Sequence, residues 1–297
     1  MVTVLIIGLD GLEYTLVEKF DLKTLQQVEY GKVDLLLENN EEPLTPTIWC
    51  NFITGKTPDV HGVRAIQKWR YPLLEKFYAS LRSFDVRHRG LWRGVLFNIF
   101  DGMNLFQMRG MRDFFTKEDI KCDTIFDDID STVAISIPSF NEDAINKELR
   151  RLVVEGRKSE LKKRAHEAFI GRKKRFLNAL NKEPSLLMVH FFLLDLIQHI
   201  FPYDNEYIKK TYERIDSFIG EVKEKLSADE VFLLIVSDHG LLEGYHTPYG
   251  FYSCNETLKL KDPKITDFAD IIRKKLGVHS EQDTKKIREK LRRLGYI

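Results

Sequence analysis

Four stretches of this chain are almost continuously apolar and rich in β-branched residues, a pattern typical of strands buried on both faces of a sheet. They span residues 2–8, 132–137, 186–192 and 231–236. A further strand is expected at 32–37. Apolar residues that recur every three or four positions predict helices at 14–20, 142–180, 204–226, 266–276 and 283–294. Strands that alternate with helices predict an α/β fold, with a mostly parallel central sheet sandwiched by helices.

Residues 64–125 do not follow this alternation and are rich in arginine and aromatic side chains. We interpret them as a small helical cap, with a short helix at 95–100, inserted into a single α/β domain that spans 1–297. Arginine and aromatic side chains suit a ligand that carries a phosphate and an aromatic group. A helical hairpin with a solvated basic face explains the same composition equally well.

The segment 45–62 contains the most distinctive local signals. Thr45 precedes Pro46 and an apolar run, and Gly55 follows that run. Proline suits the first helical position and glycine suits the position after a helix end, so a helix is expected from about Thr45 to Gly55 with Thr45 as its N-cap. A helix N-terminus also suits a phosphate group. On this segment alone, an ordinary capping threonine is the simpler interpretation.

Three of the apolar strands end in acidic residues. Asp10 follows the first strand, Asp195 follows 186–194, and Asp238 with His239 follows 231–237. Ligands of open α/β sheets bind at the carboxyl ends of the strands. One turn aspartate would be ordinary, but three such strand ends are hard to attribute to coincidence, since burying acids and imidazoles costs free energy unless a partner compensates them.

Two further histidines fit the same cluster. His199 follows Asp195 at helical i, i+4 spacing, and His246 follows the Ser237–Gly240 segment. Carboxylates combined with imidazoles are typical ligands of zinc, with manganese or iron as alternatives. The sequence therefore predicts a transition-metal site at the sheet edge.

These motifs together resemble the alkaline phosphatase superfamily, and within it the type I phosphodiesterase/nucleotide pyrophosphatase branch. The resemblance rests on four motifs in the family's order: Ile-Gly-Leu-Asp10-Gly, Thr45-Pro-Thr-Ile-Trp49 leading to Thr54-Gly55 and His61-Gly62, Asp195-Leu-Ile-Gln-His199, and Ser237-Asp238-His239-Gly240. It implies an alkaline phosphatase-like fold and a catalytic centre with two divalent metal ions, expected to be zinc with manganese as the alternative.

The resemblance also implies roles for individual residues. Thr45 would be the nucleophile, with Thr47 as the fallback, and His61 would pack the loop behind it. One metal would be bound by Asp195, His199 and His246. The other would be bound by the remaining members of the set: Asp10, Asp238, His239 and Thr45 itself.

The sequence departs from the family in three respects. It lacks a sulfatase formylglycine motif, and it is too short for the second domain of the phosphoglycerate mutases. An asparagine that the nucleotide pyrophosphatases keep after their His-Gly is also missing, and Arg64 or Gln67 would bind substrate oxygens in its place. The preference between phosphodiesters and phosphomonoesters is therefore open.

Bulk properties narrow the function further. The 297 residues include 46 Lys and Arg against 45 Asp and Glu, a net charge of +1, so nothing attracts the whole chain to nucleic acid or an anionic membrane. Three scattered cysteines form neither a disulfide framework nor a zinc pair, no basic signal-peptide region begins the chain, and no apolar stretch reaches the roughly 20 residues of a membrane span. We expect a cytoplasmic protein.

The expected activity is metal-dependent hydrolysis of phosphodiester or nucleotide pyrophosphate bonds in a small-molecule phosphate ester or nucleotide, through a covalent phospho-threonine at Thr45. Two enzymatic alternatives stay open, a phosphomonoesterase and a phosphoryl transferase or mutase. A non-catalytic protein that binds metal or phosphate is the third alternative.

Overall fold

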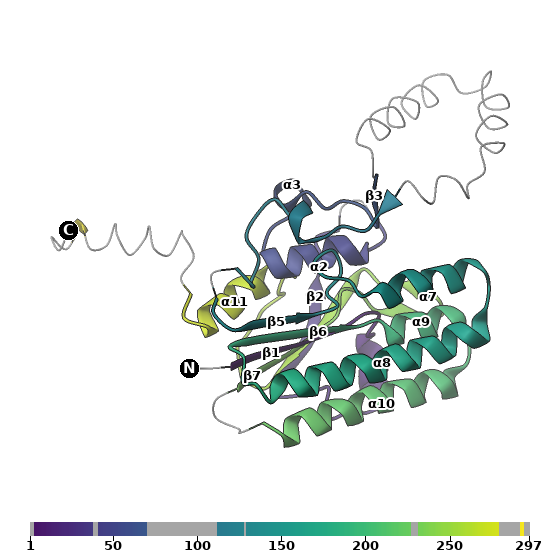
Figure 1. Ribbon diagram of the computed structural model, residues 1–297. Helices are drawn as coiled ribbons and strands as arrows, with labels where there is room; N and C mark the ends of the chain where they lie inside the picture. The colour runs from purple at the N-terminus through teal and green to yellow at the C-terminus, as the bar shows by residue number, and fades with distance from the viewer. Residues whose placement is uncertain are drawn as a thin grey trace. The chain divides into compact units, whose positions relative to one another are not determined.

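A six-stranded mixed sheet forms the centre of the molecule (Figure 1). Its strand order is β2-β10-β7-β1-β6-β5. The strands are β1 (Thr3–Leu9), β2 (Glu29–Asp34), β5 (Thr132–Ile135), β6 (Leu186–Phe191), β7 (Val231–Val236) and β10 (Tyr249–Cys254). β1 pairs in parallel with β6 and β7, β5 pairs in parallel with β6, and β10 pairs antiparallel with both β7 and β2. The prediction of an α/β fold with a mostly parallel sheet is confirmed.

The computed structural model describes residues 3–37, 41–69, 112–127, 129–226, 231–278 and 292–293. The chain divides into two compact units, one formed by Met1–Arg64 with Thr116–Ile297 and the other by Ala65–Phe115. The expected helix at 95–100, and that at 283–294 except for residues 292–293, lie outside the described residues. The cap role of 64–125 and the single-domain organisation of 1–297 stay predictions.

Helices cover both faces of the sheet, because alternate residues of the buried strands point to opposite sides. On one face Leu5 and Ile7 pack with side chains of α8 and α10, while on the other Val4 and Ile6 pack with side chains of α2 and α11. The helices are α1 (Tyr14–Lys19), α2 (Thr45–Thr54), α3 (Pro58–His61), α7 (Ala144–Val154), α8 (Lys158–Leu180), α9 (Leu193–Ile200), α10 (Asn205–Glu224) and α11 (Asp267–Lys275). None of these helices has the length and apolarity that crossing a bilayer requires.

The remaining elements are short. They are the strands β3 (Lys68–Trp69), β4 (Arg112–Asp113), β8 (Leu241–Leu242) and β9 (Tyr245–His246), and a 3₁₀ turn at Lys117–Asp119. β8 and β9 form a small antiparallel hairpin directly after the Asp238 loop. This hairpin brings His246 back toward the sheet edge.

Helix α2 packs directly on β1 because Gly8 has no side chain. A Cβ at Gly8 would lie 2.6 Å from Cη2 of Trp49, whose ring is fully buried. We expect Gly8→Ala to lower the free energy of unfolding by about 1–3 kcal/mol, the usual cost of overpacking. Gly171→Ala on α8 is the matched control, since its Cβ meets nothing within 4 Å, and helix propensity should make it stabilising by up to about 1 kcal/mol. Urea unfolding of both variants measures the difference; equal midpoints would contradict this packing.

Candidate active site

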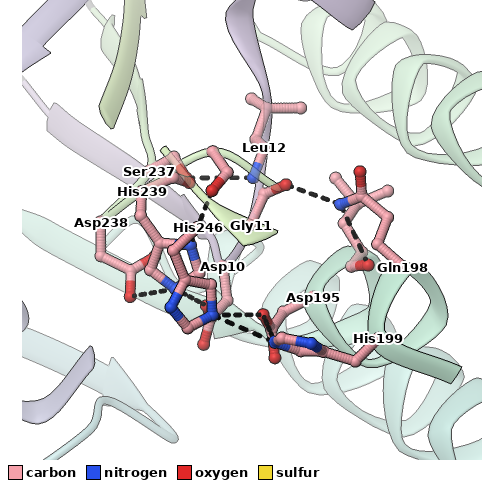
Figure 2. A network of polar contacts seen from close by, with 12 residues as sticks. Asp10, Gly11, Leu12, Asp195, Gln198, His199, Ser237, Asp238, His239 and His246 are labelled. Carbon is pink, nitrogen blue, oxygen red and sulfur yellow. Dashed lines mark hydrogen bonds and ion pairs between the residues drawn. The ribbon is translucent and has the colours of Figure 1, made fainter. Parts of the chain in front are cut away.

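The acids at the ends of three neighbouring strands meet at one edge of the sheet (Figure 2). Asp10 directly follows β1, Asp238 follows β7 by two residues, and Asp195 lies in the first turn of α9 after β6. β1 lies between β6 and β7 in the sheet, so their carboxyl ends are adjacent. Local apolar sequence fixes each strand, and the parallel register then brings the acids together.

One group of donor atoms comes from α9 and the β8–β9 hairpin. Nε2 of His199 lies 3.2 Å from Oδ1 of Asp195 and 3.0 Å from Nε2 of His246. The His246 Nε2 and the Asp195 Oδ1 are 3.9 Å apart. Donor atoms at about 2.1 Å around a tetrahedral zinc ion are separated by about 3.4 Å, so the three atoms are spaced as ligands of one such ion.

A second group surrounds the end of β1. Nε2 of His239 lies 3.1 Å from Oδ1 of Asp10 and 3.5 Å from Oδ2 of Asp238. Ligand atoms of these three residues all lie within 4.8 Å of one another, and His239 forms a similar set with Asp195 and His246. His239 therefore adjoins both groups. Its Nδ1 donates to the carbonyl of Gly240 at 3.1 Å, which leaves Nε2 free to act as a ligand.

The carboxylates of this cluster lack partners. Oδ1 of Asp10, Oδ1 of Asp195 and both carboxylate oxygens of Asp238 are buried without a hydrogen bond of normal geometry. Leaving buried ionised groups unpaired costs several kcal/mol, so native structures pair such groups or use them as metal ligands. Unpartnered carboxylate oxygens facing imidazole nitrogens are the donor set that a divalent transition metal requires, and the residues present therefore fit two cations.

Burial and the neighbouring charges also shift the pKa values of the second group, formed by Asp10, Asp238 and His239. Burial raises the pKa of Asp238 well above its ordinary value, and the charge of Asp10 raises it further. Burial alone would raise the pKa of Asp10, but contacts with His190 and His239 hold that pKa well below its usual range. Burial would lower the pKa of His239, yet the facing carboxylates of Asp238 and Asp10 raise it to about 10.

Thr45 lies beside this cluster at the start of α2. The prediction that Thr45 is the N-cap is wrong: the cap is Leu44, whose carbonyl accepts from the N–H groups of Thr47 and Ile48 at 2.9 and 3.0 Å. Thr45 is instead the first helical residue. Its half-buried hydroxyl faces Asp238 and lowers the pKa of that carboxyl.

Thr47, the fallback nucleophile, lies on the same helix in different surroundings. Only 9% of Thr47 is exposed, and its hydroxyl is buried without a partner. The contact that links Thr45 to the acids therefore favours Thr45 as the reacting hydroxyl.

The loop after β1 connects the elements that carry the acids. Leu12 N–H donates to Oγ of Ser237 at 3.1 Å, and Nε2 of Gln198 donates to the carbonyl of Gly11 at 2.8 Å (Figure 2). Gly11 has a φ of 74°, and a Cβ there would lie 2.8 Å from Cα of Asp195. The sequence interpretation assigned no role to Gln198.

Glu13 is another buried residue that the sequence interpretation missed. Its carboxylate accepts hydrogen bonds from the hydroxyls of Tyr249 at 2.9 Å and Thr247 at 3.0 Å. Thr247 directly follows His246, and its hydroxyl accepts from the N–H of Gly240 at 3.1 Å. Glu13 thereby ties the β8–β9 hairpin to the loop after β1. Its position three residues after Asp10 was the only available signal, and that signal is weak.

The sequence analysis treated His190 only as an interruption of an apolar run. It lies in β6 with 1% of its surface exposed, and Nε2 is 3.4 Å from Oδ2 of Asp10. Burial lowers its pKa. Which residue of β6 faces Asp10 depends on the pairing register, so the sequence alone held no clear signal.

The substrate-binding roles of Arg64 and Gln67 stay predictions. The guanidinium of Arg64 forms an ion pair with Asp59, and 59% of the Arg64 side chain is exposed. Gln67 belongs to the unit Ala65–Phe115. His61 is buried, its Nε2 is 2.7 Å from Oδ1 of Asn51, and its Nδ1 accepts from Val63 N–H at 3.1 Å. These contacts agree with the packing role predicted for His61.

Comparison with known families identifies the chain. It belongs to the type I phosphodiesterase/nucleotide pyrophosphatase family, whose model matches residues 4–294. The resemblance inferred from the motifs is confirmed. Membership supports a hydrolase of the phosphodiesterase or pyrophosphatase type, acting on small-molecule phosphate esters or nucleotides with the help of metal.

One solved structure agrees with the fold, and others match part of the chain more loosely. The PH0037 protein from Pyrococcus horikoshii matches with a TM-score of 0.52 and 13% identity, over 94% of this chain and 98% of that chain. Human ectonucleotide pyrophosphatase/phosphodiesterase 5 matches with a TM-score of 0.42 and 13% identity, over 81% of this chain and 57% of that chain. Phosphonoacetate hydrolase from Sinorhizobium meliloti 1021 matches with a TM-score of 0.44 and 14% identity, over 80% and 56%. A search of the curated proteins found no match.

Proposed function

We propose that this protein hydrolyses phosphodiester or nucleotide pyrophosphate bonds through a covalent phospho-threonine at Thr45, with two divalent metal ions, zinc expected and manganese the alternative. One observation carries the proposal: three strand-end carboxylates and three imidazoles form adjoining groups whose members lie within ligand distance of one another, and the Thr45 hydroxyl faces one of those carboxylates, that of Asp238.

We assign Asp195, His199 and His246 to one cation, and Asp10, Asp238, His239 and Thr45 to the other. Cations bound there would act as Lewis acids that neutralise the negative charge on a reacting phosphate. The chain's own residues supply the geometry around them. The carbonyl of Gly240 accepts a hydrogen bond from Nδ1–H of His239 and so fixes its tautomer, and Glu13 and Thr247 hold the hairpin that carries His246.

Thr45 then acts as the nucleophile. Its hydroxyl proton passes to solvent as Oγ1 forms a bond to phosphorus and the bond to the leaving oxygen breaks. The leaving group departs, and water later cleaves the phospho-threonine, which returns the Thr45 hydroxyl and releases the phosphate product. The helix begins at Thr45, so the positive end of the α2 dipole lies at the reacting atom and stabilises negative charge there. The burial of Asp10 and Asp238 keeps bulk water away from these two carboxylates.

The segment 64–125 would cap this site, and Arg64 and Gln67 would bind the substrate's phosphate oxygens. The exposure of Arg64 supports this role, because an exposed pair with Asp59 contributes little stability and is easily exchanged for a phosphate. A cytoplasmic location is the accompanying proposal. It is supported by three free cysteines, Cys50, Cys122 and Cys254.

A substrate comparison tests the proposal. Bis(4-nitrophenyl) phosphate and 4-nitrophenyl phosphate should be assayed with added zinc or manganese, with and without glycerol as an acceptor. We expect the diester to be hydrolysed faster than the monoester, with water rather than glycerol as the acceptor. Faster turnover of the monoester would favour a phosphomonoesterase. Formation of phosphorylated or nitrophenylphosphorylated glycerol would favour a transferase. Metal binding without turnover of either substrate would favour a non-catalytic protein.

A further inference from the structure

His190 is a buried polar side chain without a normal partner. Only 1% of it is exposed, and neither ring nitrogen makes a hydrogen bond of normal geometry. A buried donor or acceptor left unpaired costs about 1–3 kcal/mol. An apolar side chain of the same shape would avoid that cost, so the presence of an imidazole here requires an explanation.

The position of His190 in the sheet aims it at the cluster. The parallel register pairs His190 with Gly8, two residues before Asp10, and side chains two residues apart lie on the same side of a strand. Because Gly8 has no side chain, Trp49 reaches over it and packs edge-on against the imidazole, with ring centroids 5.0 Å apart. The ring is thereby held with Nε2 toward Asp10.

The two oxygens of Asp10 face different histidines. Oδ1 lies 3.1 Å from Nε2 of His239, on the side of the second ligand group, and Oδ2 lies 3.4 Å from Nε2 of His190. A carboxylate without a second partner can rotate and offer either oxygen to a cation. A donor on Oδ2 leaves Oδ1 as the oxygen presented to the ligand group. The 3.4 Å separation is long for a hydrogen bond, as is common before a ligand fixes both groups.

The backbone of His190 is anchored as well. Nη1 of Arg172 on α8 donates to the His190 carbonyl at 3.0 Å, and the same guanidinium donates to Asp143 and Asn146. Arg172 is 2% exposed. A buried cation with three partners is a rigid support, so β6 is fixed at the residue that faces Asp10.

We propose that His190 is a positioning residue for the metal centre: its Nε2–H holds Oδ2 of Asp10, so that Oδ1 is presented to the cation of the Asp10/Asp238/His239 group. This inference rests on the proposed function, because it requires that group to bind a metal ion. Partners that orient metal ligands in this way are typically worth 10- to 100-fold in affinity.

Zinc titration by calorimetry of the metal-free protein tests the proposal. His190→Phe keeps a ring of similar shape against Trp49 but removes the donor, whereas His190→Gln keeps an N–H where Nε2 lies. We expect wild type to bind two zinc ions, and His190→Phe to bind one of them about 10- to 100-fold more weakly. His190→Gln should stay close to wild type. Without metal, His190→Phe and His190→Gln should both unfold cooperatively in urea, which shows that any loss of zinc affinity is measured on folded protein.

The outcomes separate the inference from the function that it rests on. A wild-type protein that binds no zinc or manganese would contradict the proposed metal centre itself. If wild type and His190→Phe bind two zinc ions equally well, only the role of His190 is overturned. That role is also overturned if the Phe variant is less stable without metal and loses both ions. If the Phe variant does not fold, His190→Asn against His190→Gln decides the question, since only the longer amide reaches Asp10.

Discussion

Replacing Thr45 with alanine is expected to reduce turnover of bis(4-nitrophenyl) phosphate by roughly 10³-fold or more, the scale of losing a covalent nucleophile. The hydroxyl of Thr47 does not replace it in facing Asp238, since that hydroxyl is buried without a partner. The loss should appear in kcat. The metal content should fall by no more than one ion per chain, because Asp195, His199 and His246 are untouched.

Thr47→Val is the matched control for this prediction. It removes a hydroxyl two residues away on the same helix and keeps the shape of the side chain. Because that hydroxyl has no hydrogen-bond partner, its loss should leave stability and kcat nearly unchanged. Full activity of Thr45→Ala would rule out the covalent mechanism. An inactive Thr47→Val beside an active Thr45→Ala would move the nucleophile to Thr47.

Replacing Asp238 with asparagine should raise the stability of the metal-free protein and remove the part of its stabilisation by zinc that one of the two ions contributes. A carboxyl whose pKa is raised by burial and by Asp10 opposes folding at every pH above its ordinary pKa, because folding then disfavours its ionised form. Removing that charge should stabilise the metal-free protein by about 1–3 kcal/mol at neutral pH. The same change removes a ligand of the second group.

Urea unfolding with and without zinc measures both effects. At a free zinc concentration 100 times the dissociation constant, each ion should stabilise wild type by about 2.7 kcal/mol, and Asp238→Asn should lose that increment for one ion. Asp216→Asn is the matched control: Oδ1 of Asp216 accepts from Leu25 N–H, outside the ligand groups, and zinc should stabilise this variant as it does wild type. Zinc stabilisation that is unchanged in Asp238→Asn would remove Asp238 from the metal centre.

The parts of the fold that are buried on both faces could be predicted from the sequence. β1, β6 and β7 are apolar along most of their length and were predicted within one or two residues, as was α10. β10 was missed because its residues, Tyr249–Cys254, mix aromatic, glycine and polar side chains. β2 begins three residues earlier than expected, because this strand is largely exposed and polar and gives no clear period.

Some residues of the candidate site could also be predicted from the sequence, and others could not. Acids and histidines that follow strands or share a helical turn could be found, because their place in the chain fixes their place at the sheet edge. The supporting residues could not. His190 faces Asp10 only through the register that pairs it with Gly8, and Glu13 reaches the site through Thr247 and Tyr249, more than 230 residues away. Such pairings depend on the tertiary fold rather than on local pattern.

Anomalous diffraction at the zinc edge, from crystals of the protein grown with zinc, tests the central claim most directly. The account predicts two peaks about 3.5–4 Å apart, the spacing of two-metal sites, one bounded by Asp195, His199 and His246 and the other by Asp10, Asp238 and His239. The same experiment with manganese shows whether that metal takes either position. Absence of both peaks, with these six side chains ordered and pointing away from one another, would contradict the account.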